Sequence, residues 1–164
     1  MSISCNNEWN DVLSVNVSTN GASWSVGDVP DWLTFSAVNG TGNATVNVIV
    51  KKNSLAVERE AAVDFFAESA TAQLKVKQSA APPTTSLSVT EKECGFSEDS
   101  VEVVVTTNGL NWEIDQTVDW VSFDKTSGSS EESLNIQVQK NLSRDDRTGT
   151  IVFASGSSYC HDTY

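Results

Sequence analysis

The sequence predicts an all-β protein, built as two tandem antiparallel β-sandwiches of about seven strands each. Three observations predict it: apolar and polar residues alternate with a period of two, the chain repeats itself at a fixed interval, and a Pro-containing segment separates the two copies. A length of 164 residues is enough for two small domains. The hydrophobic content of 38% is modest, but plentiful Asn, Ser, Thr and Val and only three prolines favour a folded, strand-rich chain over a disordered one.

The internal repeat has an interval of 88 residues, at which Trp24 matches Trp112 and Trp32 matches Trp120. Residues 17–67 align on 105–155 without a gap and share 15 of 51 positions. The matched pairs include Asn20/Asn108, Gly21/Gly109, Asp31/Asp119, Phe35/Phe123, Gly40/Gly128, Asn53/Asn141, Arg59/Arg147 and Phe65/Phe153. The two halves are therefore copies of one domain.

Each copy contains short alternating segments typical of strands with one buried face. In the first copy these segments lie near Ile3, 13–17, 22–26, 33–35, 46–50, 63–65 and 74–76, and the second copy repeats most of them at 101–105, 112–114, 134–138 and 151–153. Helical spacing is not sustained anywhere. The Asn-Gly pairs resemble tight hairpin turns, whereas an immunoglobulin topology requires the chain to change sheets there.

A Pro-Pro segment separates the copies and sets the expected domain boundaries. We expect the first sandwich over 1–78, a short semi-rigid linker over 79–86, and the second sandwich over 87–164.

Charge and composition exclude several functions. With a net charge of -12 and a sequence pI near 4.3, the chain lacks the basic surface that nucleic-acid binding needs. No apolar run approaches the roughly 20 residues of a membrane span. His161 is the single histidine and no paired carboxylates recur in both copies, so we expect no enzyme activity, no cofactor and no metal. Regularly spaced calcium ligands are not found either.

The repeated pattern resembles a known family. The first copy reads VSTNGASWSV, DWLTFS, a Gly, a strand ending in KKN, an Arg, and AQLKVKQ, and the second reads VTTNGLNWEI, DWVSFD, VQKN and GTIVFASG. This resembles the BACON domain, a Bacteroidetes-associated module named for proposed carbohydrate binding. The resemblance implies immunoglobulin-like sandwiches in an exported protein, located in the periplasm, on the outer-membrane surface or outside the cell. It also implies binding of a polysaccharide or glycoprotein glycan.

The second copy departs from this pattern at its end, where Cys160 to Tyr164 replace the segment AQLKVKQ of the first. We expect its last strand to be truncated or missing, and the chain to be part of a longer polypeptide that is monomeric. An exposed sheet edge at this place would need cover.

The tryptophans are the candidate sugar platforms. Trp24 and Trp112 share the inward phase of their strands and are predicted to be core residues. Trp32 and Trp120 are out of phase with the core residues that follow them, and each comes after an Asp that can accept hydroxyl hydrogen bonds, Asp31 or Asp119. They are candidates for ligand contact or for a structural role under a turn. Trp9, with Phe96 roughly equivalent in the second copy, is either a cap on the sandwich or a binding platform.

Other residues leave alternatives open. Asn53/Asn141 and Arg59/Arg147 fit a scaffold role, although their groups could also bind sugar hydroxyls. Cys94 could pair with Cys160 or with Cys5, or all three thiols could be free. The segment Asp99-Ser100-Val101 resembles a bacterial O-glycosylation sequon.

Two functions fit these features. The first is a non-catalytic carbohydrate-binding or adhesion module, selecting neutral glycans because residues 84–164 carry fourteen acidic and five basic residues. The second is a structural spacer that holds another domain away from the membrane and has no ligand of its own.

Overall fold

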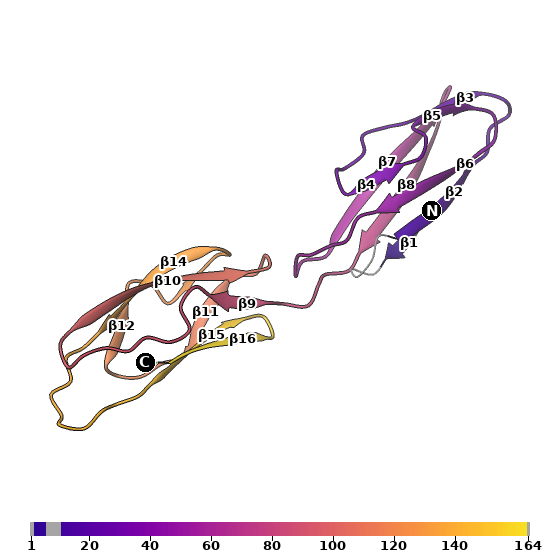
Figure 1. The fold of residues 1–164 in the computed structure, drawn as a ribbon. Helices are drawn as coiled ribbons and strands as arrows, with labels where there is room; N and C mark the ends of the chain where they lie inside the picture. The colour runs from indigo at the N-terminus through magenta and orange to yellow at the C-terminus, as the bar shows by residue number, and fades with distance from the viewer. Residues whose placement is uncertain (1, 6–10, 164) are drawn as a thin grey trace. The chain divides into compact units, whose positions relative to one another are not determined.

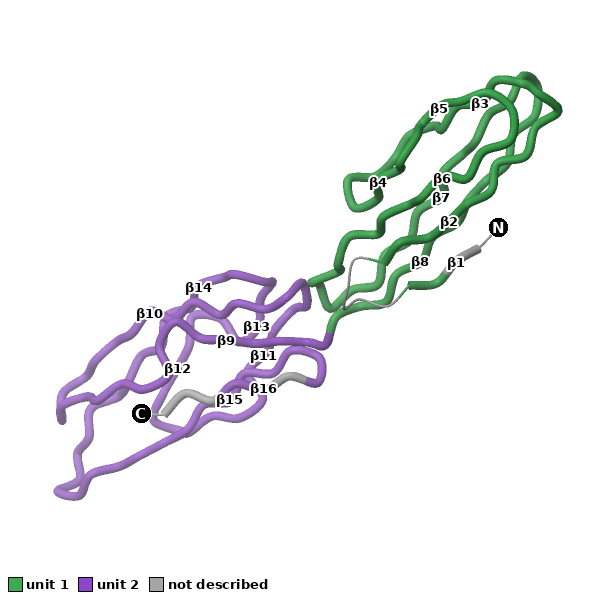
Figure 2. Tube along the Cα trace, turned by 45° about the vertical axis from the view of Figure 1, so that its right-hand side comes forward, with its two compact units in different colours: residues 1–81 green, residues 82–164 purple. Residues whose placement is uncertain are grey.

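The fold is formed by strands alone in the part of the chain that the structure describes. A computed structural model describes residues 2–5 and 11–163 and divides the chain into two compact units, Met1–Ala81 and Pro82–Tyr164 (Figures 1 and 2). Within the described residues no helix is present that is long and apolar enough to cross a membrane. The division falls inside the segment expected to link the copies.

Unit 1 is a sandwich of two sheets. Its strands are β1 (Ser2–Cys5), β2 (Asp11–Val17), β3 (Ser23–Val26), β4 (Leu33–Phe35), β5 (Asn39–Thr41), β6 (Ala44–Val50), β7 (Arg59–Ala67) and β8 (Ala70–Gln78). One sheet has the order β2-β6-β4 and the other the order β1-β8-β7-β3-β5. All pairs are antiparallel except β1 with β8, which run parallel.

Unit 2 repeats this arrangement with one change at its start. Its strands are β9 (Thr85–Leu87), β10 (Asp99–Thr107), β11 (Trp112–Gln116), β12 (Val121–Phe123), β13 (Ser127–Gly128), β14 (Glu132–Val138), β15 (Thr150–Ser155) and β16 (Ser158–Thr163). The sheets have the orders β12-β14-β10-β9 and β13-β11-β15-β16. The first strand of unit 2 therefore joins the sheet of β10, whereas β1 joins the sheet of β8.

The strand order of unit 2 is that of an immunoglobulin-like sandwich. Strands β9, β10, β14 and β12 take the places of strands A, B, E and D, and β11, β15 and β16 take those of C, F and G. Strand β13 is an addition at the edge of the second sheet. The predicted fold class is confirmed, with eight described strands in each unit in place of about seven.

The chain changes sheets at the Asn-Gly pairs. Strand β2 lies in one sheet and β3 in the other, and the same holds for β10 and β11, so neither pair closes a hairpin. Gly21 has a φ of 84° and Gly109 a φ of 103°. This left-handed conformation is one that glycine adopts without steric cost, which accounts for the repeated glycine.

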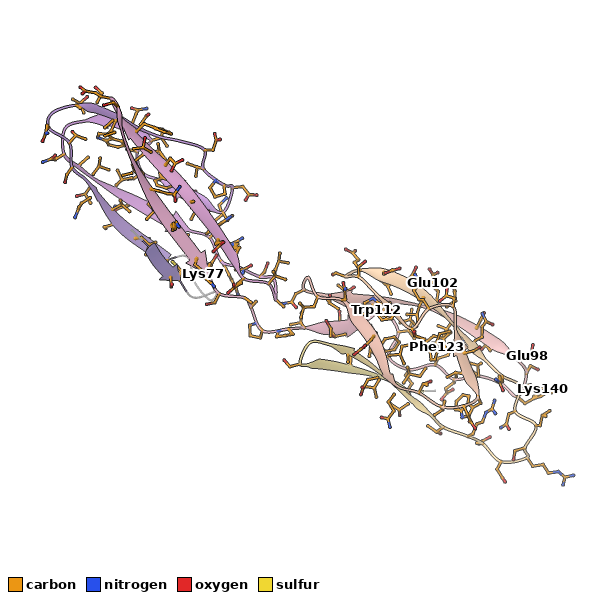
Figure 3. The ribbon with its side chains drawn as sticks, turned by 180° about the vertical axis from the view of Figure 1, so that it is seen from behind. Lys77, Glu98, Glu102, Trp112, Phe123 and Lys140 are labelled. Carbon is orange, nitrogen blue, oxygen red and sulfur yellow. The ribbon has the colours of Figure 1, made fainter. Side chains whose placement is uncertain are left out.

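The two tryptophans that strand alternation predicted to be core residues are buried, one in each unit. Trp24 is 4% exposed and Trp112 is 1% exposed, and Trp112 lies inside unit 2 in Figure 3. Each indole lies on a glycine of the neighbouring edge strand, because a Cβ on Gly40 or Gly128 would lie 2.6 or 2.7 Å from the Cζ2 atom of the ring. This close approach explains why both glycines repeat.

The closing strand of unit 2 is present as β16, and of the two alternatives it is the shortened strand that the structure shows. It pairs with β15 over six residues, whereas β8 pairs with β7 over nine. The predicted linker 79–86 is only partly a linker, because β9 begins at Thr85. The side chain of Asn108 holds this segment by accepting from the amide of Thr84 at 2.9 Å and donating to the carbonyl of Pro82 at 2.9 Å.

The three cysteines are free thiols. Cys5 is buried in unit 1, and burial is the main cause that raises its thiol pKa. Neither disulfide that the sequence left open is formed.

Candidate functional site

Trp32 lies in the core of unit 1 and not on its surface. The ring is 9% exposed and packs in the same cluster as Leu33, Val50 and Val76. Trp32 belongs to a turn closed by the hydrogen bond from the amide of Leu33 to the carbonyl of Pro30, 3.0 Å long, so it does not follow the alternation of β4. Of the two alternatives for Trp32, the structural role under a turn is the one that these contacts support.

Arg59 covers the ring of Trp32. The guanidinium carbon lies 4.7 Å from the ring centroid, a cation–π geometry. The guanidinium also donates to the carbonyl oxygens of Lys51 and Lys52 at 2.7 and 3.1 Å, and its Nε donates to Oε1 of Gln78 at 2.9 Å. Burial lowers the pKa of Arg59, and the charge of Asp31 acts in the opposite direction. Arg59 thus joins three parts of the unit around one indole.

Asn53 has a comparable structural role beside this stack. Its side chain is 1% exposed, and Nδ2 donates to the carbonyls of Val57 and Ser79 at 2.8 and 3.0 Å. Its Oδ1 accepts from the amide of Leu55 at 3.2 Å. Of the alternatives for Asn53 and Arg59, the scaffold role is the one that these contacts support.

The same stack in unit 2 is more open. The carbon of the Arg147 guanidinium lies 4.4 Å from the ring centroid of Trp120, and the guanidinium donates to the carbonyl of Gln139. Trp120 is half-buried against the core of unit 2. A Cβ on Gly149 would lie 2.7 Å from Cζ2 of Trp120, so the ring rests directly on that backbone.

A groove of about 500 Å³ opens beside Trp120. One wall is the segment 91–96, the other is the loop 143–148 with Asn141, and Trp120 and Val138 complete the lining. The amide of Asn141 donates to the carbonyl of Phe96 at 2.9 Å and joins the two walls. In unit 1 the corresponding arginine and asparagine bond to the end of β8. Arg59 donates a hydrogen bond to the side chain of Gln78, and Asn53 donates one to the carbonyl of Ser79.

The groove combines aromatic and polar groups. Phe96 is 72% exposed and Trp120 is half-buried, and both line the groove. Asn141 holds its own loop, since Nδ2 donates to the carbonyl of Asp145 at 3.0 Å and Oδ1 accepts from the amide of Ser143 at 3.0 Å. Such a surface offers aromatic ring faces beside hydrogen-bond donors and acceptors.

The cysteine in the groove is not activated. Burial raises the pKa of the Cys94 thiol, and a hydrogen bond to the carboxylate of Asp99 raises it further. The pKa of Asp99 is lowered, first by the amide of Ser100 and then by Lys92, which lies 3.1 Å away. A protonated thiol is a poor nucleophile, so the groove offers no thiolate chemistry.

The remaining candidates are placed as follows. Asp31 and Asp119 are both exposed, and neither lines the groove. Trp9 lies outside the described residues. Ser100 is exposed at the start of β10. No cluster of metal-ligating side chains occurs in the part of the chain that the structure describes. The sequence offers Phe96 only as the counterpart of Trp9, because the groove that it lines with Trp120 is formed by two loops that are distant in sequence.

The two units match two related family models. Residues 22–79 match the BACON model, described as "Putative binding domain, N-terminal", and residues 84–163 match the model described as the viral BACON domain. No significant match exists among the curated proteins.

Solved structures with similar strands include enzymes and tandem immunoglobulin domains. A Bacteroides ovatus GH5 xyloglucanase in complex with a XXXG heptasaccharide is 25% identical over 49% of this chain and 17% of the enzyme, with a TM-score of 0.45. The endo-fucoidan hydrolase MfFcnA9 is 12% identical over 98% of this chain and 32% of its own, with a TM-score of 0.36. The titin domains z1z2 in complex with telethonin are 11% identical over 99% and 89%, with a TM-score of 0.42. This chain thus spans less than a third of the length of either enzyme.

Proposed function

We propose, from the premise that this chain belongs to the BACON family with one BACON-type domain in each unit, that it is a non-catalytic accessory module that binds carbohydrate through the groove of unit 2. Such a module would serve an exported protein, in the periplasm, on the cell surface or outside the cell. The observation that supports this proposal best is the groove itself, in which Phe96 and Trp120 lie beside the loop 143–148.

The chemical groups that line the groove match those that a sugar chain requires. A pyranose presents an apolar face and a rim of hydroxyls, so it requires a ring to stack on and donors and acceptors around it. Phe96 supplies an exposed ring, and Arg144, Asp145 and Asp146 are among the polar residues that line the same groove. A cavity of about 500 Å³ is within the range of small-molecule sites.

The charge of the groove favours neutral glycans. Its lining carries Glu91, Glu93, Asp145 and Asp146 against Lys92, Arg144 and Arg147, and unit 2 as a whole is strongly acidic. Glycans rich in carboxylate or sulfate would be repelled by this field. Plant cell-wall polysaccharides and mucin glycans of low charge are the ligands to test first.

Affinity gel electrophoresis of the full chain in neutral polysaccharides tests the proposal. We expect Phe96→Ala and Trp120→Ala each to weaken retention by about tenfold or more, since each removes a ring from the groove. Phe96→Ala is the cleaner change because that ring is 72% exposed and its removal leaves the core intact.

Leu142→Ala is the matched control. Leu142 is 86% exposed in the same loop but does not line the groove, so its removal should leave retention unchanged. Equal retention of the Phe96 variant and the parent chain would reject the groove as the site. If no polysaccharide retards the parent chain, the structural spacer is the better function, and the stack of the half-buried Arg59 on the buried Trp32 is the observation that favours it.

A further inference from the structure

The sheet β2-β6-β4 of unit 1 has an outer face without charged side chains. Successive residues of a strand point to opposite faces, and in these three strands every second residue is exposed. The exposed residues of the strands, together with the residue that follows β4, are Val12, Ser14, Asn16, Thr34, Ser36, Thr45, Asn47 and Ile49. We call this set the neutral face, and its lack of charge contrasts with the net charge of -12 of the chain.

One row of the neutral face is apolar. Val12 lies opposite Ile49, and Ile49 lies opposite Thr34, so the three side chains form a row across β2, β6 and β4. Val12 is 62% exposed and Ile49 is 41% exposed. Exposed apolar side chains that adjoin one another are a mark of an interaction surface.

The next two rows are polar and present free donors. The hydroxyl of Ser14 donates to Oδ1 of Asn47 at 3.0 Å, and the hydroxyl of Thr45 donates to Oδ1 of Asn16 at 3.0 Å. These bonds fix both asparagine side chains by their oxygens. The Nδ2 groups of Asn16 and Asn47 have no hydrogen-bond partner among the described residues, so they remain available to an acceptor on another molecule.

The fold itself does not require this face to be neutral or apolar. The interval of 88 residues places Glu102 and Asp124 on the same face of unit 2, where both are exposed (Figure 3 labels Glu102). It also places Ser100 and Gln137 where the aliphatic pair of unit 1 lies. The same sheet therefore forms with charged and polar residues at these positions, and the neutral face is a property of unit 1.

We propose that the neutral face of unit 1 binds the surface of an insoluble neutral polysaccharide, in which extended chains pack side by side. Such a surface presents C–H groups that cover the row of Val12 and Ile49, and oxygens that accept from the amides of Asn16 and Asn47. Because the ligand is uncharged, a charge on the face would lose its water without gaining a partner. The proposal rests on the proposed function for the class of ligand only, since the groove lies in the other unit.

A second copy of the chain is a weaker candidate for this face. Two neutral faces in contact would set amide donors against amide donors, while the amide oxygens are already bonded within each face. The face also carries no Trp, Tyr or Arg, the residues that contribute most of the energy in protein interfaces. A polysaccharide surface, by contrast, supplies both acceptors and apolar groups.

Depletion of the full chain from solution by crystalline cellulose and by insoluble mannan tests the proposal, and Ser36→Asp is the main variant. The amide of Asn47 donates to Oγ of Ser36 at 2.9 Å, and in unit 2 the amide of Asn135 donates to Oδ1 of Asp124 at 2.9 Å. An aspartate therefore fits this position of the sheet and adds a charge to the face. We expect the parent chain to bind at least one of the two solids and Ser36→Asp to bind it at least about tenfold more weakly.

A second variant removes the apolar row without adding charge. Val12→Ser combined with Ile49→Gln introduces the residues that unit 2 has at these positions. It should also weaken binding by about tenfold, because the burial of two aliphatic side chains is lost.

Ser25→Asp is the matched control, because Ser25 is exposed on β3 in the other sheet and receives the same charge. Ser25→Asp and Phe96→Ala should both leave depletion by the solids unchanged, and Phe96→Ala thereby separates the neutral face from the groove of unit 2. The proposal is overturned if neither solid depletes the parent chain, if Ser36→Asp binds as the parent does, or if Ser25→Asp loses as much. It is also overturned if the parent chain dimerises in sedimentation velocity and Ser36→Asp is monomeric, because the face would then join two copies.

Discussion

The two core tryptophans differ in one hydrogen bond, and this difference predicts unequal effects of the same substitution. In unit 2, Nε1 of Trp112 donates to the carbonyl of Ser129 at 2.9 Å. In unit 1, the buried Nε1 of Trp24 has no hydrogen-bond partner among the described residues. We therefore expect Trp112→Phe to destabilise its unit more than Trp24→Phe destabilises the other.

The magnitude follows from what each change removes. Both substitutions replace an indole by a phenyl ring next to a glycine, so their packing losses are similar. Trp112→Phe also removes a hydrogen bond worth about 1 kcal/mol. Trp24→Phe instead removes a buried donor whose lack of a partner costs about 1–3 kcal/mol. Trp112→Phe should thus cost about 2–4 kcal/mol more than Trp24→Phe.

The assay must report each unit separately. Urea unfolding of the full chain, followed by the amide NMR peaks of β6 and of β14, gives one free energy of unfolding for each unit. Trp24→Ala and Trp112→Ala are the reference variants, each expected to cost its own unit about 3–5 kcal/mol. Equal costs of the two Trp→Phe changes would refute the reasoning, because they would show that the indole of Trp24 is as well satisfied as that of Trp112.

Three further predictions concern the scaffold. Gly128→Ala should lower the free energy of unfolding of unit 2 by about 1–3 kcal/mol in urea unfolding, because its Cβ would lie 2.7 Å from the ring of Trp112; an unchanged midpoint would contradict this contact. Asn53→Ala should cost unit 1 about 2 kcal/mol or more, measured in the same way, because buried carbonyls lose their donor; a cost near zero would mean that water replaces the amide. The pKa of Glu132 is lowered, first by Lys125 and then by the amide of Ser129. The stability that it contributes is present above the unfolded pKa, about 4.3, and is lost as the pH falls through the folded value; Glu132→Gln should flatten this acid loss in unit 2, and an unaltered pH profile would contradict it.

Strand positions and cores could be predicted from the sequence because they depend on local alternation. Leu134, Ile136 and Val138 alternate with polar residues and are buried on one face of β14. Trp32 could not be placed in this way. It precedes its strand in a turn, and a turn residue does not inherit the phase of the strand that follows.

The sheet that each unit's first strand joins could not be predicted from the sequence. The first strands of the two units have similar short apolar patterns, yet β1 pairs with β8 and β9 pairs with β10. Alternation shows that a segment is a strand, but it does not show which of two sheet edges the strand joins. The groove beside Phe96 has the same difficulty, because its walls are loops separated by some 50 positions in the sequence.

The residues identical in both copies are mostly explained by contacts inside each copy. Arg59 and Arg147 each cover a tryptophan, and each core tryptophan lies on a glycine. A repeated residue that already has a structural partner in both units gives no separate evidence of a ligand. Phe96 is different, because it is 72% exposed and lines the groove of unit 2. This is why the proposed glycan test begins with the exposed Phe96 and not with the buried Trp32.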